Sequence, residues 1–251
     1  MAESKRDSII DRFQQHRRVR PAAPAYYEKV GATWVPATWE EFIEQVHAAA
    51  RAMIALGVQP GSVVCMLGFN RPEWVIGQLA AMMAGGVGAG IYATNSPPEV
   101  EYILNHSEAP IVILENEAQW LKVKQVRDRL THLRAAVLMR GTKIDDPLAH
   151  TWEDFLKCAD ETPEAELDAR IRAIDMEQLA SLIYTSGTTG PPKAVMLSHS
   201  NLAATARTGQ ELFKLTPNEV LLSYLPLSHI AEQMFTVHTA ATVGYPVYYA
   251  E

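Results

Sequence analysis

The side chains best suited to chemistry lie together in one short segment, Tyr184 to Lys193, which reads YTSGTTGPPK. The segment is dense in hydroxyl groups, contains glycines and ends in a lysine. Glycine lets backbone N–H groups come close to a ligand, hydroxyls donate hydrogen bonds to phosphate oxygens, and lysine adds a compact positive charge. The combination predicts a loop that binds a polyphosphate, and a plain surface loop of the same composition is the alternative.

The segment is not a Walker A loop, which requires G-x-x-x-x-G-K-[ST] between a strand and a helix. No Gly-Lys-Ser or Gly-Lys-Thr occurs, and Pro191 and Pro192 precede Lys193. The following residues, 194–197, are apolar and partly β-branched, which favours a strand. We therefore expect the loop to join two strands, so that its N–H groups and hydroxyls hold the phosphates with little help from a helix dipole.

The elements that must position this loop alternate regularly along the chain. Apolar residues recur at helical spacing after a capping box formed by Thr38 and Glu41, and Ser96 and Glu99 have the spacing of a second capping box. Similar patterns predict helices at 38–54, 72–84, 96–106 and 118–130 and from 151, and strands at 63–67, 87–92, 111–114, 135–139 and 179–184. This alternation predicts an α/β fold of layered, mostly parallel sheets built from right-handed βαβ units.

The remaining segments carry weaker patterns. Residues 1–37 are polar, and we expect an N-terminal arm and entry segment that face water. This segment contains a basic patch, formed by Arg17, Arg18 and Arg20. Residues 160–178 are charged and are predicted to lie at the surface. Further strands are expected at 220–225 and 245–249, and a helix capped by residues 198–201.

Composition excludes some classes of function. The chain has 251 residues, a formal net charge of −7 and a pI near 5.6, which argues against a broad basic face for nucleic acid. Cys65 and Cys158 match no metal-ligand spacing and are expected as buried apolar residues in a reducing compartment. No secretory signal or run of about 18 apolar residues is present, so we expect a cytoplasmic protein.

Several motifs together resemble one protein family. YTSGTTGPPKAVMLSHSN resembles the phosphate-binding loop of the adenylate-forming, or AMP-binding, enzymes, which include acyl-CoA synthetases, luciferases and nonribosomal-peptide adenylation domains. SYLPLSH, from Ser223 to His229, is similar to a motif of the long-chain acyl-CoA synthetase branch. Residues 68–74 and 92–107 also resemble that branch, in particular its bubblegum-like type. The fold implied is the N-terminal portion of the large domain of an adenylate-forming enzyme.

The resemblance implies a fatty acid, ATP, Mg²⁺ and coenzyme A as reactants and cofactors. The carboxylate would be joined to AMP with release of pyrophosphate, and the acyl group would then pass to the CoA thiol. The residues implied in binding the β- and γ-phosphates are Thr185, Ser186, Gly187, Thr188, Thr189, Gly190, Pro191, Pro192 and Lys193. Among these, Thr185 would help to hold Mg²⁺ and Lys193 would screen charge on the departing pyrophosphate.

His229 matches a family position that lines the acyl pocket near the reacting carboxylate. A structural histidine at the start of a helix is the alternative interpretation. A fatty acid substrate would also allow peripheral contact with a membrane.

Two features depart from the family pattern. Ala194 stands where the family usually has glycine, and an alanine with positive φ would strain the loop. The family is also more than twice as long as this chain. We therefore expect residues 38–251 to be the N-terminal part of an AMP-binding domain, without the C-terminal lid domain, and inactive alone. A non-catalytic nucleotide-binding fragment and an adenylating enzyme with a carrier-protein acceptor remain alternatives.

Overall fold

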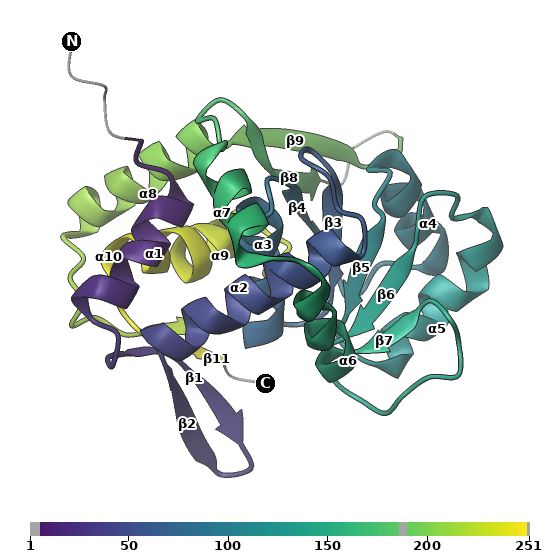
Figure 1. Cartoon of the computed structure of the whole chain (residues 1–251), viewed down its shortest axis with the longest axis horizontal. Coiled ribbons are helices and arrows are strands. Elements are labelled where there is room, and N and C mark those ends of the chain that lie inside the picture. The colour runs from purple at the N-terminus through teal and green to yellow at the C-terminus, as the bar shows by residue number, and fades with distance from the viewer. Residues whose placement is uncertain (1–5, 186–189, 250–251) are drawn as a thin grey trace.

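The computed structural model describes residues 6–185 and 190–249, and its largest layer is a seven-stranded sheet (Figure 1). The strand order is β7-β6-β5-β3-β4-β8-β9, and every neighbouring pair is parallel except the antiparallel pair β8–β9. The strands are β3 (Val63–Leu67), β4 (Val87–Ile91), β5 (Ile111–Leu114), β6 (Ala135–Leu138), β7 (Ala149–Thr151), β8 (Leu179–Thr185) and β9 (Lys193–Ser198). The predicted α/β class with mostly parallel sheets is confirmed.

Helices cover both faces of this sheet because its strands alternate their apolar side chains between two cores. Val64 and Met66 of β3 pack in one core, and Cys65 and Leu67 pack in the other. The first core contains residues of α2 (Trp39–Ala55), α3 (Pro72–Met83) and α7 (Glu164–Arg172), and the second contains residues of α4 (Pro97–His106) and α5 (Glu117–Val126). Helices α2, α3 and α7 therefore cover one face of the sheet, and α4 and α5 cover the other.

Two predicted capping boxes set the starts of these helices. Thr38 accepts a hydrogen bond from the Glu41 N–H, while the Glu41 carboxylate accepts from the Thr38 N–H at 2.7 Å. Ser96 and Glu99 form the same reciprocal arrangement at the start of α4. Both boxes satisfy N–H groups that the first helical turn leaves without a partner.

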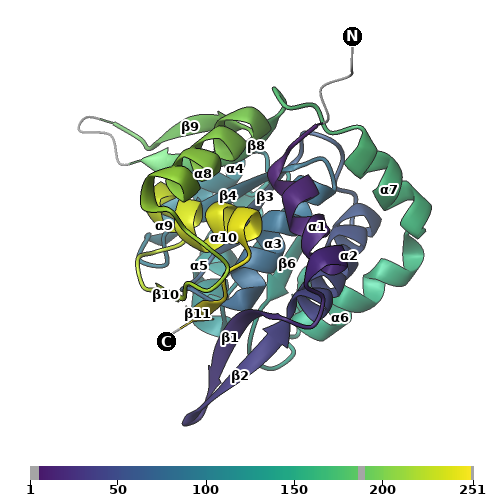
Figure 2. The ribbon, with the colours of Figure 1, turned by 90° about the vertical axis from the view of Figure 1, so that its left-hand side faces the viewer.

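A second, four-stranded sheet pairs strands from the early and late parts of the described chain. Its order is β10-β11-β1-β2, with β1 (Pro24–Val30), β2 (Thr33–Thr38), β10 (Leu221–Ser223) and β11 (Val247–Tyr249). β1 pairs in parallel with β11, with Tyr26 opposite Val247. The β1–β2 hairpin projects from the body of the molecule, whereas the C-terminal helices gather beside α1 (Ile9–Val19) (Figure 2). These helical segments are α8 (His199–Phe213), α9 (Ile230–Gln233), a π-helical turn (Met234–Thr239) and α10 (Ala240–Val243).

The expectation that the first 37 residues form a solvated arm is wrong. Helix α1 (Ile9–Val19) buries Ile9, Ile10 and Phe13 completely, while Arg17 and Arg18 face water. A helix needs only one narrow apolar stripe to pack on a core, and here the stripe is hidden among charged residues. β1 also pairs with β11, which lies far beyond residue 37, so both sides of the expected boundary share one sheet.

The segment 160–178 lies largely at the surface, as expected, but part of it is a regular helix. It contains α7, which buries Leu167 and Ile171 against the first core. The short elements α6 (Trp152–Lys157), η1 (Arg127–Arg129) and η2 (Cys158–Glu161) complete the helices. Cys65 is buried as expected, but Cys158 is only half-buried. Within residues 6–185 and 190–249, no helix combines the length and apolar character that crossing a membrane requires.

Candidate active site

The phosphate-loop segment joins two antiparallel strands, as the sequence predicts. Thr185 ends β8 and Lys193 begins β9, and the two residues are partners in the ladder. The Thr185 hydroxyl donates to the Lys193 carbonyl at 3.4 Å. Partners in an antiparallel ladder project their side chains to the same face of the sheet. The hydroxyl and the ammonium group therefore lie on one face, at the two ends of the loop.

This hairpin opens at the edge where the parallel strands β4 and β8 both end. Ligands of open α/β sheets bind outside the carboxyl ends of the strands. A crevice of about 340 Å³ lies there, lined by Tyr92, Asn95, Glu99, Ile103, Tyr184, Thr185, Pro192 and His229. Three residues predicted from the sequence, Thr185, Pro192 and His229, thus meet at one crevice although His229 is 44 positions from Thr185 in the sequence (229 − 185 = 44).

His229 fits both interpretations that the sequence left open. It is the N-cap of α9, and its Nδ1 accepts a hydrogen bond from the Ala231 N–H at 3.1 Å. The residue is also exposed and lines the crevice. An Nδ1 that accepts leaves the proton of the neutral ring on Nε2. The cap therefore selects the tautomer whose Nε2–H can donate to an anionic ligand.

The other predicted loop residues divide into two groups. Gly190, Pro191 and Lys193 are exposed but are not among the described residues that line the crevice. Ser186, Gly187, Thr188 and Thr189 lie outside the described residues, so their predicted contacts stay predictions. Gly190 has φ = +113°, a conformation that side chains with a Cβ rarely adopt.

The expected strain at Ala194 is absent. This residue lies within β9, opposite Tyr184, and is not one of the described residues with positive φ. An extended strand residue accommodates a methyl group without steric cost. The departure from the family pattern at this position therefore does not distort the β9 backbone.

Several crevice residues were not identified as site residues from the sequence. Glu99 accepts hydrogen bonds from the Ser96 hydroxyl and N–H, and these bonds lower the pKa of its carboxyl. The Tyr184 hydroxyl hydrogen-bonds His106 Nδ1 at 2.9 Å, and burial raises the pKa of Tyr184. The available signal was positional: Tyr92 and Tyr184 stand where two neighbouring strands end.

The donor set indicates how a metal could be held. Among the residues that the structure describes, no cluster of three or more His, Cys, Asp or Glu side chains could hold a metal ion. Mg²⁺ commonly binds through few protein ligands together with substrate phosphates. The exposed Thr185 hydroxyl at the crevice fits that arrangement, in which the protein supplies few of the metal ligands and the substrate phosphates supply others.

These features define an α/β protein with a crevice beside a hairpin loop whose sequence is rich in hydroxyl groups. The family model of AMP-binding enzymes matches residues 13–251. The chain belongs to this family.

Relatives with described activities match most of this chain. It is 38% identical over 232 residues to the long-chain-fatty-acid–CoA ligase ACSBG2 of Xenopus laevis, which covers 90% of this chain and 31% of that protein. It is 37% identical over 224 residues to the long-chain-fatty-acid–CoA ligase ACSBG1 of Bos taurus, covering 87% of this chain and 31% of that protein. The chain thus spans about a third of the length of these relatives.

Solved structures share the fold at lower identity. The anthranilate CoA ligase AuaEII in complex with anthranoyl-AMP superposes with a TM-score of 0.82 at 21% identity, over 97% of this chain and 45% of that one. The long-chain-fatty-acid-CoA ligase FadD1 of Archaeoglobus fulgidus superposes with a TM-score of 0.80 at 22% identity, over 96% and 46%. The chain therefore shares its fold with somewhat less than half of each of these two proteins.

Proposed function

We propose that the protein containing this chain is a long-chain fatty acid–CoA ligase. In the first step a carboxylate oxygen of the fatty acid attacks the α-phosphorus of ATP, the bond to the bridging oxygen breaks, and pyrophosphate leaves. In the second step the thiolate of CoA attacks the acyl carbonyl, the bond to AMP breaks, and acyl-CoA forms. The relatives named as long-chain-fatty-acid–CoA ligases support this substrate class.

The observation that carries the proposal is the crevice shared by Thr185 and His229. On one side, the hydroxyl-rich hairpin offers hydrogen-bond donors suited to the ATP phosphates. On the other, the Nε2–H of His229 suits a carboxylate. Both reactants would therefore meet within one crevice, which is what a bimolecular attack on phosphorus requires.

The proposed roles of Lys193 and Thr185, at the two ends of the loop, follow from the charge of the first and the hydroxyl group of the second. Lys193 would screen the negative charge that develops on the departing pyrophosphate. Thr185 would supply a hydroxyl ligand for Mg²⁺, which when bound neutralises phosphate charge. Hydrogen bonds from Ser96 lower the pKa of the Glu99 carboxyl at the crevice, and the Lys193 ammonium would offset part of the repulsion between this carboxylate and the phosphates. A cytoplasmic location and peripheral membrane contact remain predictions from the sequence.

The test is an exchange assay on the purified full-length protein. Labelled pyrophosphate should enter ATP only when palmitate is present, and CoA should then yield palmitoyl-CoA by mass spectrometry. Benzoate and a free amino acid serve as alternative acids, and a phosphopantetheinyl carrier protein as an alternative acceptor. The Thr185→Val variant, nearly isosteric but without a hydroxyl, should exchange more slowly. Exchange stimulated only by benzoate or the amino acid would refute the proposed substrate class.

A further inference from the structure

The segment from Ser223 to His229 connects β10 to α9 and brings His229 to the crevice. Apolar burial holds only part of this segment. Leu227 is fully buried, but Tyr224 is 75% exposed and Leu225 is 39% exposed. Other interactions must therefore fix the course of the backbone that precedes His229.

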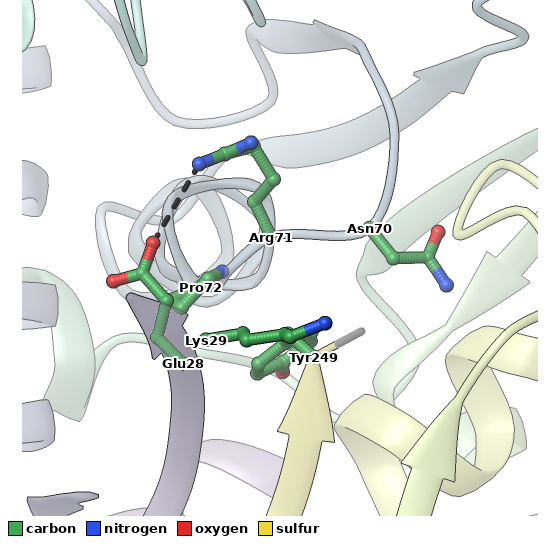
Figure 3. Close-up of a pocket in the computed structure, with 6 residues that line it drawn as sticks. All are labelled: Glu28, Lys29, Asn70, Arg71, Pro72 and Tyr249. Atoms are coloured by element: carbon green, nitrogen blue, oxygen red, sulfur yellow. Dashed lines mark ion pairs between the residues drawn. The ribbon is translucent and has the colours of Figure 1, made fainter. Parts of the chain in front are cut away.

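Asn70, which follows β3 in the large sheet, holds this segment from one side. Its Nδ2 donates to the Ser223 hydroxyl at 2.7 Å and to the Leu225 carbonyl at 2.6 Å. Its Oδ1 accepts from the Leu227 N–H at 3.0 Å. Figure 3 shows the Asn70 amide pointing away from the Glu28–Arg71 ion pair and toward the yellow C-terminal segment. The Asn70 side chain thus forms hydrogen bonds with every second residue from Ser223 to Leu227.

Glu232, on α9, holds the same segment from the other side. Its carboxylate accepts from the hydroxyls of Ser223 and Thr236, both at 2.6 Å, and from the Leu225 N–H at 3.2 Å. Glu232 is only 5% exposed, and a buried carboxylate is tolerated when donors surround it. Gln233 adds a hydrogen bond from Nε2 to the Leu227 carbonyl at 2.9 Å.

Close packing against β4 completes the arrangement. A Cβ on Gly90 would lie 2.7 Å from the Ser228 Cα, so only glycine lets the segment approach this strand without a shift. Gly90 is two residues before Tyr92, which lines the crevice. The segment is therefore seated on the same strand that leads into the crevice.

We propose that Asn70 and Glu232 are positioning residues that hold the 223–229 segment so that His229 meets the substrate carboxylate. The role at the carboxylate rests on the proposed function, whereas the clamp on the segment does not. Neither residue lines the crevice within the part of the chain that the structure describes. They act through the backbone, and Asn70 couples the end of β3 to the orientation of His229.

Hydrogen–deuterium exchange of the full-length protein tests the clamp directly. The N–H groups of Leu225 and Leu227 are held by Glu232 and Asn70. In Asn70→Ala, a peptide covering 224–229 should exchange at least several-fold faster, while peptides from β3 and β4 should be unchanged. Asn201→Ala is the matched control, because the Asn201 side chain accepts a hydrogen bond from the Ser198 N–H at the start of α8, away from the 223–229 segment. Unchanged exchange of 224–229 in Asn70→Ala would overturn the proposal.

Kinetics test the consequence for the reaction. Asn70→Ala should lower the kcat of adenylate formation by up to about 10²-fold, the effect of a displacement near 1 Å, with the KM for ATP unchanged. Asn70→Asp keeps the size and the bond to Leu227 but places an acceptor against the Leu225 carbonyl, and should also lower kcat. If Asn70→Ala does not fold, Asn70→Asp and Glu232→Gln carry the test.

A double-mutant cycle separates positioning from general destabilisation. If Asn70 acts through His229, adding Asn70→Ala to His229→Ala should cause almost no further loss of kcat. If the kcat losses of the two single variants multiply in the double variant, Asn70 does not act through His229. An inactive wild-type protein would refute the proposed function and the role at the carboxylate, and the exchange result would still decide whether the clamp exists.

Discussion

Thr185 and Lys193 face each other across the last pair of the β8–β9 ladder, so the loop between them starts and ends at one point on the sheet. Their side chains project to the same face. The flexible side chain of Lys193 can therefore extend toward an anion that contacts the Thr185 hydroxyl. The ladder, not the loop itself, sets this relationship, since ladder hydrogen bonds fix the register.

Replacing Lys193 by alanine in the full-length protein should slow adenylate formation by about 10²–10³-fold, the scale for losing one preorganised charge-stabilising group. Fatty acid affinity should hardly change, because the proposed contact of the carboxylate is His229 and not Lys193. Pyrophosphate exchange measures the rate, and Lys124→Ala, an exposed lysine on α5, is the control. An unaltered exchange rate would exclude the assigned role.

Gly190→Ala should weaken ATP binding, whereas Ala194→Gly should leave it equal. The first change places a Cβ at φ = +113°, where such strain costs about 1–3 kcal/mol, although the space around it is open. The second removes a methyl from a strand and should lower only the free energy of unfolding, by up to about 1 kcal/mol. Calorimetric titration with ATP and urea unfolding distinguish the two. Tighter ATP binding by Ala194→Gly would mean that the methyl does hinder the loop.

Gly90→Ala should lower both stability and the rate of adenylate formation. The added Cβ would lie 2.7 Å from the Ser228 Cα and 3.2 Å from the Trp74 ring, and overpacking of this kind costs about 1–3 kcal/mol. Gly209→Ala in α8 is the control, because its Cβ would meet only the Thr239 hydroxyl at 3.7 Å. That control should be neutral or slightly stabilising. Full activity of Gly90→Ala would mean that the 223–229 segment tolerates displacement.

Stability should fall in acid because of buried histidines in the C-terminal helices. Burial lowers the pKa of His238 to about 3, and the nearby His199, itself lowered to about 4 by burial, opposes a second charge. An unfolded histidine titrates near pH 6.5, so below this pH the unfolded chain binds protons that the folded protein excludes. Each such histidine should then reduce the free energy of unfolding by up to about 1.4 kcal/mol per pH unit.

Urea unfolding at pH 7, 6 and 5 measures this dependence. His238→Leu should flatten the decline between about pH 6.5 and 3, while the slopes from His199 and from His16, whose pKa burial also lowers to about 4, remain. The pKa values of the Asp7 and Asp11 carboxyls lie below the ordinary value for aspartate. Burial raises these pKa values, but hydrogen bonds and ion pairs with arginines lower them by more. An identical slope in wild type and His238→Leu would show that His238 does not contribute.

Local signals in the sequence predicted most of the large sheet correctly. The capping boxes at Thr38 and Ser96 and the short β-branched runs depend on neighbours a few residues away, so they can be recognised without tertiary context. Helix α1 was missed because its stripe of Ile9, Ile10 and Phe13 is short and surrounded by charge. β7 was missed because three half-buried residues carry no alternation.

The sequence by itself determined the hairpin loop from Thr185 to Lys193, the family to which the chain belongs and the alternation that produces parallel strands. Only the tertiary structure decided that His229 shares a crevice with Thr185, that β1 pairs with β11, and that Asn70 holds the segment before His229. The physical reason is the separation in sequence over which each kind of interaction acts. Caps, turns and periodicity act between near neighbours, whereas these contacts join residues far apart in sequence and form only once both sheets and their cores have packed.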